Sequence, residues 1–141
     1  MYIAIDFDGT IVEHKYPKIG KDVPFALHFM RKFQEAGAKL ILFTMRSGRE
    51  LDDAVRYLRD CDIKMYGINH NPDQHSWTSS PKAYAHVYID DAAFGCPMIA
   101  SKEMDGRPMV DWEKVGPHIL RTMEFLEKSQ PIVKQGCHIR R

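Results

Sequence analysis

Four short apolar runs recur along the chain, and polar residues bound each of them. They occupy residues 2–5 (YIAI), 39–43 (KLILF), 64–68 (KMYGI) and 86–89 (HVYI), of which the third is the weakest. Short runs of this kind, rich in β-branched residues, are typical of strands buried on both faces of a parallel sheet. The pattern therefore predicts four strands.

The segment between the first two runs has the spacing of an amphipathic helix. Asp22 is expected to cap this helix, with Pro24 in its first turn, and Gly37 is expected to end it. Its apolar stripe consists of Ala26, Phe29, Met30 and Phe33. A helix in this position connects one strand to the next.

Two further helices are predicted later in the chain. Ser47 and Glu50 have the spacing of a capping box, and an apolar stripe follows them: Leu51, Ala54, Val55 and Leu58. Residues 111–128 predict a last helix, whose expected buried side consists of Ile119, Leu120, Met123 and Leu126. Residues 129–141 lack a hydrophobic period and are expected to form a flexible tail.

Strands that alternate with helices imply right-handed βαβ crossovers. The expected fold is therefore α/β: a doubly wound, Rossmann-like, mostly parallel sheet with helices on both faces. A chain of 141 residues supports one core. We expect a single domain over residues 1–128, and neither residues 10–22 nor 67–82 are long enough to form a cap domain.

Composition excludes several classes of protein. The 20 Lys and Arg residues nearly balance 19 Asp and Glu residues, so charge gives no general reason to expect nucleic acid or a membrane as partner. Nothing at the N-terminus resembles a signal peptide, and no apolar stretch approaches the roughly 18 residues that cross a bilayer. With three unpaired-looking cysteines, Cys61, Cys96 and Cys137, the expected protein is cytoplasmic with reduced thiols.

The candidate chemistry follows the strands. Asp6 and Asp8 come directly after the first run, where an extended backbone would point both carboxylates the same way, and Asp90-Asp91 follows the last run. Such crowded carboxylates need a cation or a shared proton as compensation, and a divalent metal is the simplest choice. Mg²⁺ prefers a shell of this kind. Thr44 ends the second run and Lys82 precedes the last one, and both could hold the oxygens of a phosphate.

Four segments resemble, in order, the four motifs of the haloacid dehalogenase superfamily, over roughly residues 1–95. They are Asp6-Phe7-Asp8-Gly9-Thr10, Leu42-Phe43-Thr44, Lys82 and Ile89-Asp90-Asp91. The resemblance implies that Asp6 is a nucleophile that becomes transiently phosphorylated, and that Asp8 is a general acid and base. It also implies that Thr44 and Lys82 stabilise the transferred group.

The resemblance further implies that Mg²⁺ binds Asp6, the backbone carbonyl of Asp8, and Asp90 or Asp91, and which of the last two binds directly is open. An acid at Asp8 favours a phosphatase, and the missing cap places the chain among capless members. Gly9, Thr10, Arg46 and Arg49 are expected to contact the substrate. Residues 11–21, which include Tyr16, could form a flap over it.

The expected substrate is a phosphorylated small molecule or a phosphorylated group on a macromolecule, and a homo-oligomer is possible. Two other functions stay open. One is a phosphoacceptor signalling domain, in which a phosphoaspartate would persist for many minutes. The other is a non-catalytic module that binds metal or phosphate.

Overall fold

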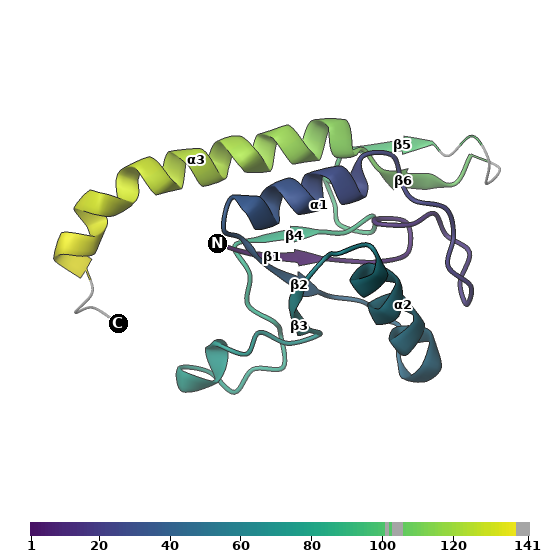
Figure 1. Ribbon diagram of the computed structural model, residues 1–141, viewed down its shortest axis with the longest axis horizontal. Helices are drawn as coiled ribbons and strands as arrows, with labels where there is room; N and C mark the ends of the chain where they lie inside the picture. Colours follow the sequence, from purple (N-terminus) through teal and green to yellow (C-terminus); the bar gives the residue numbers. More distant parts are fainter. Residues whose placement is uncertain (101, 103–105, 138–141) are drawn as a thin grey trace.

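The computed structural model describes residues 1–100, 102 and 106–137. Its central sheet contains β1 (Tyr2–Ile5), β2 (Lys39–Leu42), β3 (Met65–Ile68) and β4 (Val87–Ile89), in the order β3-β2-β1-β4. All three pairings are parallel, and the strands run side by side in Figure 1. The predicted α/β fold with a parallel, Rossmann-like sheet is confirmed, and so are the four strands.

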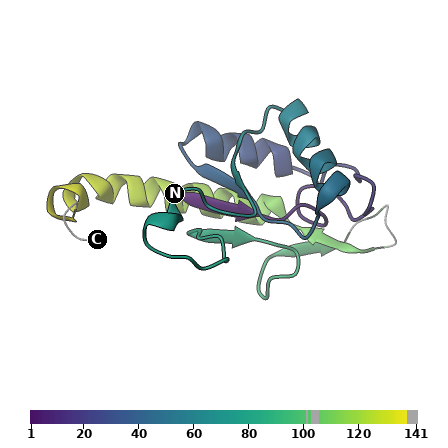
Figure 2. The same ribbon diagram turned by 90° about the horizontal axis from the view of Figure 1, so that it is seen from below.

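The α-helices are α1 (Ala26–Glu35), α2 (Gly48–Asp60) and α3 (Trp112–Cys137). All three contribute to one core, which they form with the sheet face that carries Ile3, Ile5, Leu40 and Leu42. Figure 2 shows α1 and α2 together above the sheet. Each of the two joins consecutive parallel strands, as a right-handed crossover requires.

The opposite face of the sheet is covered by the connection from β3 to β4. This connection contains the short 3-10 helix η1 (Gln74–Ser76), and its Ala83 and Ala85 pack against Ala4 and Ile41 of the sheet. The prediction of helices on both faces is therefore wrong for the α-helices, which all form one layer, while a loop with a single 3-10 turn forms the other. The connection from β3 to β4 was predicted to be too short for a cap domain, and it covers its face without an α-helix.

A two-stranded antiparallel sheet precedes α3 and was not predicted. Its strands are β5 (Met98–Ala100) and β6 (Pro108–Val110). Strands of three residues are too short to show an alternating pattern, so the sequence offers little signal for them. The backbone N–H of Val110 donates to the carbonyl of Gly9 at 3.0 Å, which ties this hairpin to the loop after β1.

Both predicted helix caps are wrong in detail. The N-cap of helix α1 is Phe25, which has φ 68° and makes no side-chain capping hydrogen bond, and Asp22 instead forms a β-bridge with Val12. Pro24 therefore lies ahead of the helix. Ser47 does precede α2, but its side chain makes no capping hydrogen bond, so the predicted capping box with Glu50 does not form.

Helix α3 continues past its predicted end at residue 128 and reaches Cys137, the last described residue. Both ribbon views show its C-terminal part extending beyond the sheet (Figures 1 and 2). The apolar period stops near Leu126, which is why the sequence pattern ended the helix early, while the backbone remains helical. The rest of the expected tail, residues 138–141, lies outside the described residues.

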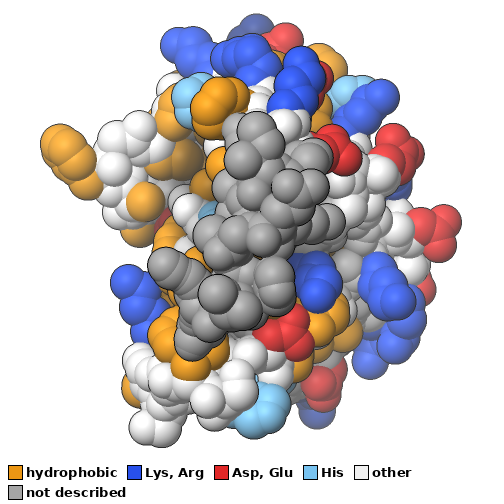
Figure 3. Space-filling view, turned by 90° about the vertical axis from the view of Figure 1, so that its left-hand side faces the viewer, with side chains coloured by type: hydrophobic (Ala, Val, Ile, Leu, Met, Phe, Trp, Pro, Cys, Tyr) orange, Lys and Arg blue, Asp and Glu red, His pale blue; other side chains and the backbone are white. Residues whose placement is uncertain are grey.

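The face of the protein drawn in Figure 3 carries charged side chains of both signs. In the side view of Figure 3, Lys and Arg side chains are interspersed with Asp and Glu side chains.

Cys61 and Cys96 are both free thiols. Among the described residues, none of the helices combines the length and the apolar character that crossing a bilayer requires.

Candidate active site

The candidate site lies where β1 and β4 end. Ile5 pairs with Ile89 in the sheet, so Asp6 and Asp90 leave neighbouring strands at the same level. The N–H of Asp6 donates to the carbonyl of Ile89 at 2.9 Å, which continues the ladder by one residue. Ligand sites in open parallel sheets occupy this carboxyl edge, and the topology brings both acidic motifs to it.

Three carboxylates gather there. Asp6, Asp90 and Asp91 each offer an oxygen, and these oxygens lie within 4.8 Å of one another. Burial raises the pKa of Asp6 to about 8, and the neighbouring Asp91 and Asp90 add to this effect. Burial also raises the pKa of Asp90. Without a cation, the protein therefore keeps Asp6 protonated at neutral pH rather than hold adjacent negative charges.

This donor set fits a hard divalent cation. Mg²⁺ binds one or a few carboxylates together with water and substrate oxygens, and it prefers oxygen to nitrogen or sulfur ligands. Of the four residues predicted as metal ligands, the structure brings the side chains of Asp6, Asp90 and Asp91 together. The side chain of Asp8 is not part of this group.

The hydroxyl of Thr10 contacts both Asp6 and Asp91. Its side chain is buried, and its hydroxyl accepts the backbone N–H of Asp91 at 3.1 Å. The same hydroxyl lies 3.5 Å from a carboxylate oxygen of Asp6 and from one of Asp91. The hydroxyl of Thr10, predicted to contact substrate, is thus engaged in holding the two acidic motifs together.

Gly9 makes room for Asp91. With φ at +80°, a Cβ on this residue would lie 2.3 Å from Asp91 Oδ2 and 2.7 Å from His14 Nε2. No larger side chain fits without displacing the carboxylate. The role of Gly9 is therefore to allow the backbone to approach Asp91 closely.

His14 belongs to the site and was missed. Its Nε2 donates to Asp91 Oδ2 at 3.1 Å. A ring nitrogen on a predicted metal ligand can fix the orientation of that ligand. The sequence placed His14 only within a possible flap, and a lone histidine in a loop carries no other signal.

Asp8 lies outside this carboxylate group and pairs with Arg46. Nε of Arg46 donates to Asp8 Oδ2 and Nη2 donates to Asp8 Oδ1, both at 2.8 Å. Arg46 is only 2% exposed, so its predicted contact with substrate is not available in this arrangement. The carboxylates that crowd Asp6 are Asp90 and Asp91, whereas the sequence suggested Asp8.

The remaining predicted residues, Thr44, Lys82 and Arg49, are not part of the carboxylate group. Thr44 follows β2 by two residues; its N–H donates to Asn69 Oδ1 at 2.8 Å, and its hydroxyl accepts the N–H of Arg46 at 3.1 Å. Lys82 is exposed, with Nζ 5.3 Å from the centre of the Tyr88 ring on β4. Arg49 lies exposed in the first turn of α2. The structure joins Thr44 to Arg46 directly and leaves Lys82 on the opposite face of the sheet from the α-helices.

Comparisons with known proteins identify one informative neighbour. No family model matches the chain, and a search of curated proteins finds no match. The solved structure of a conserved protein from Bacteroides thetaiotaomicron is similar, with 35% sequence identity and a TM-score of 0.71. The match covers 86% of this chain and 91% of that one. No activity is named for that protein, so the function must be argued from the site.

Proposed function

The chain belongs to the same family as the conserved Bacteroides thetaiotaomicron protein, and we propose that it is a cytoplasmic, metal-dependent phosphomonoester hydrolase of the haloacid dehalogenase type. One observation carries the proposal. Asp6 shares the carboxyl edge of a parallel sheet with Asp90 and Asp91, and their oxygens lie within 4.8 Å. Such a group can hold a cation and a phosphoryl group side by side.

Asp6, Asp90 and Asp91 would hold the cation, which we expect to be Mg²⁺. When bound, the ion would neutralise the charge that develops on the transferring phosphoryl oxygens. At neutral pH, Asp6 is mostly ionised only when a nearby positive charge offsets its raised pKa. The same group of residues thus explains both the need for a cation and the availability of a carboxylate nucleophile.

The reaction then proceeds in two displacements. An oxygen of Asp6 attacks phosphorus and forms an acyl phosphate, while the ester P–O bond breaks and Asp8 gives its proton to the leaving oxygen. Water next attacks phosphorus, Asp8 takes a proton from it, and the bond from Asp6 to phosphorus breaks. Inorganic phosphate leaves, Asp6 is again a carboxylate, and Asp8 is again protonated.

Thr44 and Lys82 would contact the phosphoryl oxygens. The backbone of Thr44 is fixed by Asn69, which places the hydroxyl at the end of β2. Lys82 would leave the ring of Tyr88 and bring its ammonium group to the phosphate. Their contribution is stabilisation of the charge on the transferred group.

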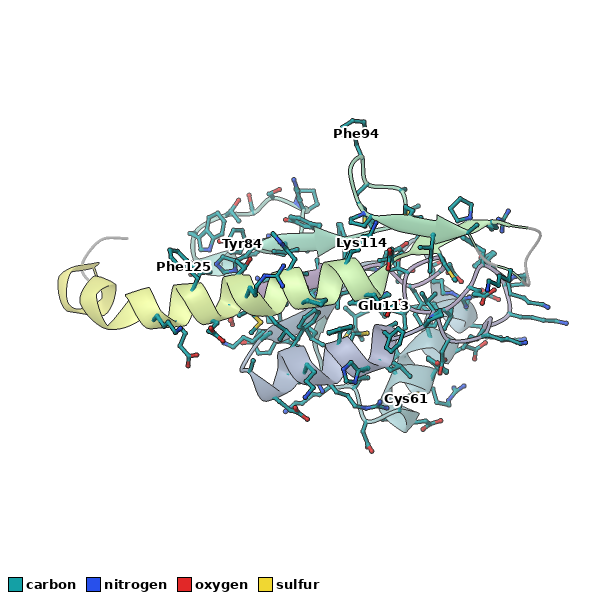
Figure 4. The ribbon with its side chains drawn as sticks, turned by 90° about the horizontal axis from the view of Figure 1, so that it is seen from above. Cys61, Tyr84, Phe94, Glu113, Lys114 and Phe125 are labelled. Atoms are coloured by element: carbon teal, nitrogen blue, oxygen red, sulfur yellow. The ribbon has the colours of Figure 1, made fainter. Side chains whose placement is uncertain are left out.

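The surroundings of the site favour an open entrance. Met45 follows Thr44 at the end of β2 and is 96% exposed, while Phe94 follows Asp91 beyond β4 and is fully exposed. Figure 4 shows Phe94 pointing away from the body of the protein. Because β1 lies between β2 and β4, these two residues follow the strands on either side of the one that Asp6 follows. The substrate class is a phosphorylated small molecule or a phosphorylated group on a macromolecule.

Phosphate release tests the proposal. A panel of phosphomonoesters is incubated with the wild type, with Asp6→Asn and with the control Asp62→Asn, in Mg²⁺ and in a chelator. Asp62 is exposed at φ 61°, a conformation that Asn also adopts. We expect release with Mg²⁺ by the wild type and the control only. Equal release by Asp6→Asn would rule out Asp6 as nucleophile, and silence of the wild type across the panel would favour a binding module.

A further inference from the structure

Arg46 has no hydrogen-bond donor left for a ligand. Its guanidinium has five N–H groups, and five oxygens of the protein accept them. Two belong to Asp8, both at 2.8 Å. Three are backbone carbonyls: Lys18 at 2.7 Å, Pro17 at 3.2 Å and Glu50 at 3.2 Å.

Two rings enclose the same guanidinium. Its central carbon lies 4.9 Å from the ring centre of Phe7 and 5.2 Å from that of Tyr16. Phe7 is the residue between Asp6 and Asp8, and it is fully buried. Arg46 could therefore reach a substrate only by leaving two ring contacts and five hydrogen bonds.

We propose that Arg46 is a positioning residue that acts through Asp8 and does not contact the substrate. This inference rests on the proposed function, in which Asp8 transfers a proton. The two parallel hydrogen bonds fix the plane of the Asp8 carboxylate. Each oxygen of Asp8 keeps a second lone-pair position, so a proton can still be carried there.

The three carbonyl contacts explain how Arg46 is itself held. Pro17 and Lys18 belong to the loop after β1, and Glu50 belongs to the first turn of α2. Arg46 thus joins the loop, the helix and Asp8 at one point. Residues 16–18 contribute to catalysis by fixing the orientation of the acid, whether or not they close over the substrate.

A lysine cannot replace this geometry. Its ammonium group is a compact charge without the planar fork of arginine, so it would retain the attraction to Asp8 but not the fixed orientation. Arg46→Lys therefore separates charge from positioning. Arg59→Lys is the matched control, because Arg59 is exposed in the last turn of α2.

The test compares substrates that differ in their need for an acid. An alkyl phosphate has a poor leaving group, which must be protonated, whereas nitrophenyl phosphate releases a stable anion. We expect Arg46→Lys to lower kcat/KM by about 100-fold for the alkyl phosphate and by less than about tenfold for nitrophenyl phosphate. Arg59→Lys should change neither value.

Two further variants keep the test decisive if Arg46→Lys folds poorly. Tyr16→Ala removes an exposed ring from its contact with the guanidinium. It should also lower kcat/KM more for the alkyl phosphate than for nitrophenyl phosphate, by a smaller factor than Arg46→Lys does. In an Asp8→Asn background, Arg46→Lys should add little to the loss for the alkyl phosphate, since both changes act on one group.

The outcomes separate the two claims. Equal losses for both substrates in Arg46→Lys and Tyr16→Ala, or full additivity with Asp8→Asn, would overturn the positioning role and leave the proposed function intact. If the wild type hydrolyses neither substrate, nor any other phosphomonoester, the proposed function fails and the role of Arg46 fails with it.

Discussion

The indole N–H of Trp112 donates a hydrogen bond of 2.7 Å to the carbonyl oxygen of Thr10. Trp112 is the first residue of α3, and Thr10 holds Asp91 beside Asp6. The bond is buried, and it joins the start of α3 to the loop after β1, which forms part of the site. Helix α3 therefore supports the site although none of its residues is proposed to contact the substrate.

Trp112→Phe should destabilise the protein by about 1–3 kcal/mol, because the Thr10 carbonyl loses its buried donor. Urea unfolding measures the change. The control is Trp77→Phe, since Trp77 is exposed in the loop after η1. Equal midpoints for the two variants would show that the Trp112 bond contributes nothing.

Gly9→Ala should abolish metal binding. A Cβ on Gly9 would collide with Asp91 Oδ2, and φ at +80° adds strain. Gly37→Ala controls for the strain, since Gly37 has φ +94° but no atom within 4 Å of its Cβ position. Calorimetric titration with Mg²⁺ should therefore show binding in Gly37→Ala and none in Gly9→Ala. Wild-type affinity in Gly9→Ala would mean that Asp91 is not a ligand.

Metal binding should release protons in a pH-dependent way. Asp6 has a pKa of about 8 in the metal-free protein, so it is mostly protonated at pH 7 and must ionise to bind a cation. Calorimetry in buffers of different ionisation enthalpy should detect up to about one proton released at pH 7 and little at pH 9. Asp6→Asn should show no such release.

The same pKa affects the stability of the metal-free protein. The pKa of Asp6 in the folded protein lies above the ordinary value of 3.8, so folded Asp6 binds more protons than unfolded Asp6 between pH 3.8 and about 8. Stability should therefore fall as pH rises from about 4 through about 8 and then level off. Mg²⁺ should reverse this fall. Thermal unfolding of the wild type and Asp6→Asn would check it, and identical pH profiles would contradict it.

His14→Ala should weaken metal binding by about tenfold, because Asp91 loses the donor that orients its carboxylate. His118→Ala on α3 is the control, since His118 is exposed. Titration with Mg²⁺ or Mn²⁺ gives both affinities. Unchanged affinity in His14→Ala would show that the histidine is a neighbour of the site without influence on it.

The elements that sequence reasoning predicted correctly depend on local patterns. The runs that became β1 to β4 are short, apolar and bounded by polar residues, and one rule for parallel sheets brings their carboxyl ends together. This was enough to place Asp6 beside Asp90 and Asp91. The position of Thr44 at the same edge of the sheet follows from the same rule.

The parts that were missed depend on how loops fold back. The contact of Arg46 with Asp8, Pro17 and Lys18 requires the path of residues 11–21, which no periodicity encodes. The same holds for His14 on Asp91. The N-cap at Phe25 has a positive φ, a conformation that is uncommon for phenylalanine and that the sequence therefore does not predict.

Rapid acid quenching during turnover tests the central claim most directly. The peptide that contains Asp6 should carry one phosphoryl group within a single turnover, and hydrolysis should remove it within seconds in the presence of Mg²⁺. The control Asp62→Asn should acquire the same label, and Asp6→Asn should acquire none. A label that persists for many minutes would instead indicate a phosphoacceptor domain. Phosphate release without any label on Asp6 would contradict the account.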